Sequence, residues 1–273
     1  MKKNKLTLMQ EFNIAVKDSV QYQKGIYDKV NNHKYYYPKE YGERINAFLL
    51  KKKVASYETD KGSLMSTSSS ARLCTNYFYE QSNKESFAFE KPLRNDVSRA
   101  KTKMDAVDGL VFCECKCQEI VYGEKELFRN SYHTNQSSKL FKEFNISNIK
   151  SHKNRKGEED GRLDFSLRDL GINLDGKYYK INFNVKQLIC HLIAIANEYK
   201  NCDEQKVLKY IIFKPKKELI DASDALKKLY ADLDNQFKAI KDSKKIQDFL
   251  DEHHISLEME YVYIDTVIEH FGD

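Results

Sequence analysis

Apolar and polar positions follow two different periods along the chain, which indicates both helices and strands. Between residues 184 and 199 the apolar positions recur with a helical period, and a Lys-rich amphipathic helix is expected over about 218–240. The run 207–213 is short, apolar and followed by Pro215, which is typical of a buried strand. The pattern therefore predicts an α/β fold.

The other expected elements rest on the same periodicity and on local capping signals. Serines within the polar segment 63–70 are good N-caps for a helix over about 71–80. The remaining elements are, in chain order, a mostly helical region over 1–60, strands within 86–91 and 102–121, a short helix over 136–144, an exposed charged loop over 150–162 and a β-rich run over 256–264.

Composition narrows the class of protein. The chain has 273 residues, of which 41% are hydrophobic and 32% charged, with 10 Gly and 3 Pro. These values predict one large or two small folded domains and exclude a collagen-like or mostly disordered chain. Lys and Arg number 46 against 41 Asp and Glu, and this mild excess does not by itself identify a nucleic-acid binder.

The sequence predicts a soluble, cytoplasmic protein without a membrane span. Its basic start lacks the apolar stretch of a secretory signal. The longest apolar segment, 188–196, is interrupted by His191 and is far shorter than the roughly 20 residues that a span requires. Six cysteines without a secretory signal indicate a reduced compartment.

The segment 103–116 carries the candidate chemistry. Asp108 and Gly109 form a two-residue hairpin signal, because Gly accepts a positive φ and Asp tolerates it. With that turn, Asp105 faces Phe112, and alternate residues of a strand share a face of the sheet. One face is then expected to present Asp105, Phe112, Glu114 and Lys116, and the other Cys113, Cys115 and Cys117.

Two carboxylates and an amine on one face suit metal-dependent phosphodiester hydrolysis. Mg²⁺ prefers oxygen ligands, lowers the pKa of bound water and offsets charge that develops on a phosphate. The alternative is a solvated strand with alternating charges, and Asp108 is the rival for the first carboxylate. The cysteines lack the spacing of a zinc knuckle and are read as small packed residues.

An Asp before a hairpin followed by Glu114-x-Lys116 resembles the signature of the PD-(D/E)xK nuclease superfamily. The flanking helices and the 207–213 strand extend the resemblance over 63–215. The segments 68–78 and 87–92 are similar to a bacterial group described as restriction endonucleases. It implies a restriction-endonuclease-like core, a central mixed β-sheet flanked by helices. Residues 1–62 would be a helical extension, and 216–273 a helix and strand packed on the core.

The resemblance also implies roles for individual residues. Asp105 and Glu114 would hold Mg²⁺, or Mn²⁺, with the Cys115 carbonyl as a third ligand, and Lys116 would act on the attacking water. Met104 stands where the signature often has proline. Accessory roles at the metal or substrate are implied for Glu80, Glu90, Gln118, Gln187 and His191.

The implied activity is DNA cleavage in restriction or phage defence by a homodimer. The basic residues Lys150, Lys153, Arg155 and Lys156 are candidates for contact with the DNA backbone, although a solvated loop explains them equally well. A repair or recombination nuclease, or a catalytically silent module that binds nucleic acid or protein, remains open.

Overall fold

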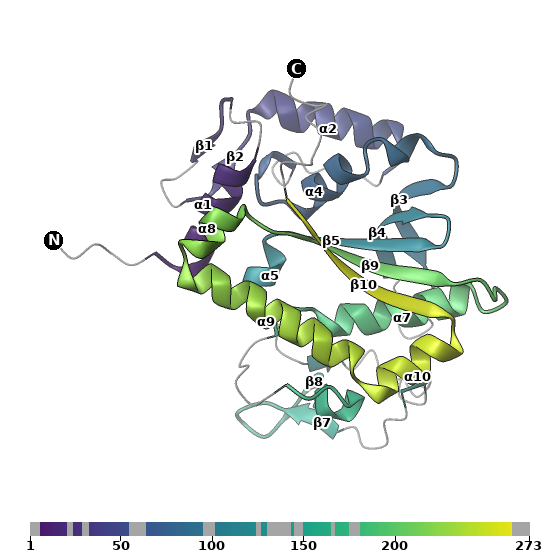
Figure 1. The fold of residues 1–273 in the computed structure, drawn as a ribbon. Coiled ribbons are helices and arrows are strands. Elements are labelled where there is room, and N and C mark those ends of the chain that lie inside the picture. The colour runs from purple at the N-terminus through teal and green to yellow at the C-terminus, as the bar shows by residue number, and fades with distance from the viewer. Residues whose placement is uncertain are drawn as a thin grey trace.

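The computed structural model describes residues 6–20, 24–28, 33–54, 64–94, 102–123, 127–129, 143–144, 150–164, 167–174 and 181–263. A mixed sheet of five strands in the order β10-β9-β5-β4-β3 forms its centre (Figure 1). Neighbours β3, β4 and β5 are antiparallel, whereas β5, β9 and β10 are parallel. The strands are β3 (Phe87–Leu93), β4 (Thr102–Asp108), β5 (Val111–Lys116), β9 (Lys206–Phe213) and β10 (Ile255–Val262). The α/β class expected from the sequence is confirmed.

Helices cover both faces of this sheet. Helix α4 (Ser70–Tyr77) packs against β4 and β5, and α7 (Val185–Glu198) packs against β3 and β4. The side chains of Ser69 and Asn184 cap these helices by accepting backbone N–H groups of their first turns. Both helices were expected from the sequence, and their apolar faces supply much of the core between helix and sheet.

The C-terminal region contributes directly to the central sheet. The helix expected over 218–240 is divided into α8 (Lys217–Asp221) and α9 (Asp224–Lys241), because Ser223 begins a new helix as its N-cap. Helix α10 (Lys244–Glu252) follows and leads into β10, which pairs with β9 over its whole length. One sheet therefore joins the central part of the chain to residues beyond 216.

The N-terminal region is less helical than expected. It contains α1 (Leu8–Ser19) and α2 (Lys39–Lys51), but between them β1 (Tyr27–Asp28) and β2 (Tyr35–Tyr36) form a small antiparallel pair. Helix α1 packs onto the core through Phe12, whose ring meets Phe213 edge-on at 6.1 Å. A short 3-10 helix, Gln81–Asn83, connects α4 to β3.

A second sheet lies between β5 and α7 in the sequence. Strand β5 is followed by helix α5 (Glu119–Tyr122) instead of the strand expected to continue to residue 121. Strands β6 (Leu127–Arg129), β7 (Lys150–Lys153) and β8 (Glu159–Asp164) form a three-stranded sheet, and a 3-10 helix, Leu167–Leu170, follows. The exposed loop predicted over 150–162 is therefore a hairpin whose turn contains Gly157 at φ 80°. Most of the helix expected over 136–144 lies outside the described residues.

The β4–β5 hairpin differs from the expected register by two residues. The turn is formed by Gly109 and Leu110, because Gly109 at φ 60° is the first central residue and Asp108 still pairs with Val111. A shift of two keeps every side chain on its face of the sheet, but Asp105 now lies level with Glu114 instead of Phe112. Asp108 belongs to β4, and its carboxylate accepts hydrogen bonds from Lys84 and Ser86.

No helix within the described ranges combines the length and apolar character needed to cross a membrane.

Candidate active site

The hairpin opens where the candidate carboxylates lie. The β4–β5 ladder ends at the pair Ala106–Cys113, and Asp105 Oδ2 then accepts the Cys115 N–H at 2.7 Å. In an extended strand the N–H and C=O of one residue point to the same side, so the Cys115 carbonyl also points to this gap. The gap therefore contains a carboxylate and a main-chain carbonyl that lie beyond the paired part of β4 and β5.

Glu114 lies on the opposite face of β5 from Cys115 and is almost fully buried, with 2% of its surface exposed. Its Oε1 accepts Lys116 Nζ at 2.7 Å and Gln187 Nε2 at 2.6 Å. Within the described part of the chain its Oε2 has no hydrogen-bond partner, and His191 Nε2 lies 3.8 Å from it. A buried carboxylate oxygen without a donor is costly, which makes this atom a candidate ligand for a cation.

Helix α7 supplies the polar groups behind Glu114. Gln187 and His191 are one turn apart and face the sheet, and His191 Nδ1 lies 3.4 Å from the hydroxyl of Tyr210 on β9. Burial lowers the pKa of His191, although the negative charge of Glu114 acts in the opposite direction. The imidazole therefore lies between Glu114 and Tyr210, and its lowered pKa favours a neutral ring that does not neutralise the carboxylate.

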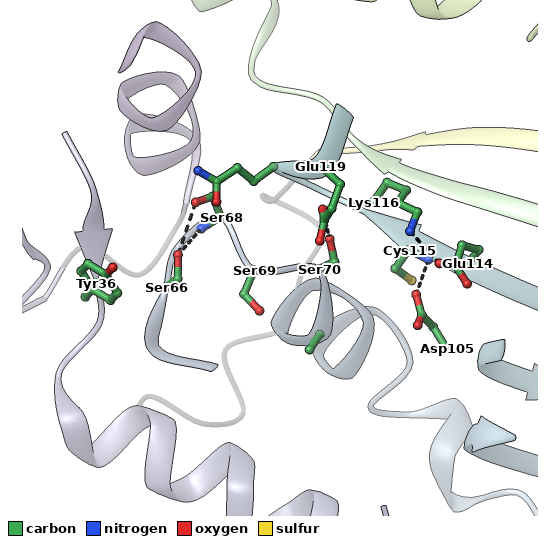
Figure 2. A pocket seen from close by; sticks show the side chains of 12 residues that line it. Tyr36, Ser66, Ser68, Ser69, Ser70, Asp105, Glu114, Cys115, Lys116 and Glu119 are labelled. Carbon is green, nitrogen blue, oxygen red and sulfur yellow. Dashed lines mark hydrogen bonds and ion pairs between the residues drawn. The ribbon is translucent and has the colours of Figure 1, made fainter. Parts of the chain in front are cut away.

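The hairpin residues open onto a cavity of about 400 Å³ between β5, α4 and the segment before α4. Figure 2 shows Asp105, Glu114 and Lys116 at one end of this cavity and Ser66 and Ser68 towards the other, with Glu119 beside Ser70 between them. The lining residues are Tyr36, Ser66, Ser68, Ser69, Ser70, Ala71, Asp105, Glu114, Cys115, Lys116, Gln118 and Glu119.

Burial and mutual charge perturb the two groups that flank Glu114. Burial raises the pKa of Asp105 well above its ordinary value, and the negative charge of Glu114 raises it further. Burial would lower the pKa of Lys116, but the charges of Glu114 and Asp105 outweigh it and raise that pKa. Lys116 is therefore an ammonium, and a bound cation would relieve the crowding of the two carboxyl groups.

Two residues that sequence reasoning missed connect β5 to α4. Ser70 Oγ donates to Glu119 Oε2, and the Cys117 N–H donates to Ser70 Oγ at 2.9 Å and to Glu119 Oε2 at 3.1 Å. Neither residue belongs to a spacing motif. The only signal was proximity, since Ser70 begins the serine-capped helix and Glu119 follows Glu114-x-Lys116 by three residues.

Some of the expected accessory residues lie at Glu114 or on the cavity wall, and others lie away from both. Gln187 and His191 contact or approach Glu114, and Gln118 lines the cavity while its Nε2 donates to Met9 Sδ at 3.0 Å. Glu90 lies level with Asp105 on β3, lines a separate cavity of about 20 Å³ beside it and pairs with Lys103 at 3.7 Å. Glu80 is exposed and does not line the cavity.

The basic hairpin lies apart from this cavity. Lys153, Arg155 and Lys156 are exposed and line no part of it, and β7, which begins at Lys150, lies at the opposite end of the molecule from α4 (Figure 1). Any contact of these residues with nucleic acid would therefore be remote from Asp105 and Glu114.

The cysteines of β5 pack beneath α4. All six cysteines of the chain are free, and burial raises the pKa of Cys74 to about 11 and that of Cys115 well above its ordinary value. Protonated thiols are poor metal ligands. Among the described residues, no group of three or more His, Cys, Asp or Glu side chains is arranged to hold a metal.

The residues at the hairpin do fit Mg²⁺, which needs fewer protein ligands than a site with three or more side chains. This ion is commonly held by one or two carboxylates, with waters and substrate oxygens completing its shell. Asp105, Glu114 and the Cys115 carbonyl line the same cavity, and Glu114 Oε2 lacks a donor. These residues would hold the cation.

Comparison with family models, with curated proteins and with solved structures gives no match.

Proposed function

We propose that this protein is a Mg²⁺-dependent nuclease of the PD-(D/E)xK type, which hydrolyses DNA phosphodiester bonds in restriction or defence. One observation carries the proposal: the hairpin opens at Asp105 and places it with Glu114 and Lys116 on the wall of one cavity. The antiparallel hairpin beside parallel strands is compatible with a restriction-endonuclease-like core. Action on both strands of a duplex favours a homodimer.

Each residue has a role that follows from its contacts. Asp105, Glu114 and the Cys115 carbonyl bind the cation, which would supply an acidified water and offset charge on the phosphate. Lys116 is held by Glu114 at 2.7 Å and carries a proton, so it orients the water and stabilises negative charge as a donor. Gln187 fixes the Glu114 carboxylate from behind.

The test is cleavage of supercoiled and linear DNA with Mg²⁺ or with EDTA. We expect the wild-type protein to cleave only with metal, and Glu114→Gln to lose at least about a hundredfold in rate, since one ligand charge is removed. Glu258→Gln is the matched control, because Glu258 is an exposed strand residue whose partner is Lys209.

Metal binding is measured in parallel by calorimetry. Cleavage by wild type and Glu258→Gln alone would support the proposal. Equal cleavage by Glu114→Gln would show that the site is wrong, and absence of both cleavage and Mg²⁺ binding would reject the enzyme. Metal binding without cleavage of any DNA would favour the catalytically silent module.

A further inference from the structure

The cavity ends in aromatic side chains on the side away from Asp105. Tyr36 lines this end, and Figure 2 shows it beyond Ser66. Tyr27, its partner across the β1–β2 pair, is 42% exposed, and the two rings stack with centroids 6.0 Å apart and planes at 29°. Among the described residues, Tyr27 has no other ring contact. The pair therefore forms an aromatic surface that begins at the cavity wall and continues into solvent.

Main-chain contacts fix this aromatic surface relative to the cavity. Tyr36 forms an antiparallel bridge with Ser66, which lines the same cavity. Beside this bridge the Tyr37 N–H donates to the Met65 carbonyl at 2.8 Å. Strand β2 is therefore joined to the segment that leads into α4, and the tyrosine rings keep a defined position beside the cavity.

Lysines surround the aromatic surface. Lys24 precedes β1, Lys34 precedes β2, and both are exposed. The Nζ of Lys17 on α1 lies 5.6 Å from the centroid of the Tyr35 ring. Aromatic rings beside lysines suit a nucleotide chain, because the rings can stack on bases and the ammonium groups attract phosphates.

The size of the cavity favours one strand over a double helix. Its volume of about 400 Å³ lies within the range of about 300–1,000 Å³ that is typical of pockets for a single small molecule. A duplex does not fit into such a space. In addition, each base of a duplex is covered on both faces by its neighbours, so only a base that has left the stack can lie on a tyrosine ring.

We infer that the cavity holds an unpaired strand of the substrate and that Tyr36 and Tyr27 stack on its bases. This inference rests on the proposed function and names its substrate class, which is single-stranded nucleic acid or an unpaired stretch within a duplex. Cleavage of a fully paired duplex then requires a nucleotide to leave the stack before its phosphate reaches Asp105 and Glu114.

The variants for the test change one exposed ring. Tyr27→Ala removes the stacking surface, and Tyr27→Phe retains the ring without its hydroxyl. The fold should be kept in both, because Tyr27 is 42% exposed, and thermal unfolding checks this. Tyr263→Ala is the matched control, since Tyr263 directly follows β10, is 41% exposed and does not line the cavity.

The experiment measures the binding of a fluorescent single-stranded oligonucleotide and of the same sequence as a duplex, by anisotropy in Ca²⁺ and in EDTA. In at least one condition, we expect wild type to bind the single strand at least about fivefold more tightly than the duplex. Tyr27→Ala should weaken single-strand binding about fivefold or more and leave duplex binding unchanged, whereas Tyr27→Phe and Tyr263→Ala should bind as wild type does.

Three results would overturn the inference: no preference of wild type for the single strand, unchanged single-strand binding by Tyr27→Ala, or an equal loss in Tyr27→Phe. The inference and the proposed function can fail separately, because cleavage in Mg²⁺ is measured on the same two substrates. A single-strand preference that only Tyr27→Ala loses, in a protein that cleaves neither substrate, would support the stacking surface and reject the nuclease. Metal-dependent cleavage without any single-strand preference would support the nuclease and reject the stacking surface.

Discussion

The buried carboxylate of Asp105 is in an unfavourable electrostatic environment, and a bound cation would relieve this penalty. It is buried beside Glu114, and burial raises its pKa well above the ordinary value. The native state therefore favours the protonated carboxyl. Stability from this group is fully present below the unfolded pKa of about 3.9 and is lost as the pH rises through the folded pKa.

Replacing this carboxyl should stabilise the metal-free protein. In EDTA at pH 8, we expect Asp105→Asn to raise the free energy of unfolding by about 1–3 kcal/mol, because no charge is buried and the amide oxygen still accepts the Cys115 N–H. The gain should shrink towards pH 3, below the unfolded pKa of about 3.9, where Asp105 is mostly protonated in both states. Denaturant unfolding at the two pH values measures it.

Asp108→Asn, on the same strand, is a control with the opposite sign. The hydrogen bonds from Lys84 and Ser86 lower the pKa of Asp108, so its contribution is present above the unfolded pKa and is lost as the pH falls. This variant should be no more stable than wild type at pH 8. A gain for Asp105→Asn that did not depend on pH would contradict the argument.

At the residue scale, the alternation of side chains along a strand was enough to predict which residues share a face of the sheet. Asp105, Glu114 and Lys116 were placed together because a register error of two residues leaves the faces unchanged. Ser70 and Glu119 could not be found in this way. Their contact with the Cys117 N–H depends on how α4 and α5 pack beside β5.

At the scale of elements, capping and turn residues determine where helices and hairpins begin and end. Ser69, Asn184 and Ser223 each accept a backbone N–H of the helix that they begin. A serine cap was predicted for the first of these helices, and the second helix was predicted from its apolar period without its cap. Ser223 was missed within a region that otherwise has one helical period. The hairpin was also predicted, although Asp108 was taken for the turn residue because it tolerates a positive φ.

The turn that sets the register can be tested at Gly109. Its φ is 60°, and an added Cβ would meet no atom within 4 Å, so the cost of Gly109→Ala is purely conformational. We expect a loss of about 1–2 kcal/mol in the free energy of unfolding. Gly157→Ala, in the exposed β7–β8 turn with φ 80° and equal space, is the control for the same backbone strain.

Denaturant unfolding and DNA cleavage should be measured for both glycine variants. Gly109 lies between the strands that carry Asp105 and Glu114, so Gly109→Ala should lower the cleavage rate as well as stability, whereas Gly157→Ala should affect stability alone. Equal effects on cleavage would indicate that the hairpin register does not control the site.

At the scale of the whole molecule, the sheet joins segments that are distant in the sequence. Strand β10 pairs with β9 from Ile255 to Val262, and Tyr77 on α4 donates to Glu260 on β10 at 2.9 Å. Sequence periodicity identified each strand, but strand order depends on long-range pairing and packing that no local pattern specifies. The domain boundary expected at residue 215 therefore separates β9 from β10, which are neighbouring strands of one sheet.

This continuity predicts that the isolated segment 63–215 does not fold. Without β10, the backbone of β9 would expose an unpaired edge, and its buried residue Phe213 would lose contact with Tyr230 of α9 and Phe12 of α1. We expect the fragment to be aggregated or to lack a cooperative thermal transition by circular dichroism, whereas the full chain unfolds in one transition. A fragment that melted cooperatively and bound Mg²⁺ would show instead that the central region is an independent domain, with the C-terminal helices and β10 as a dispensable addition.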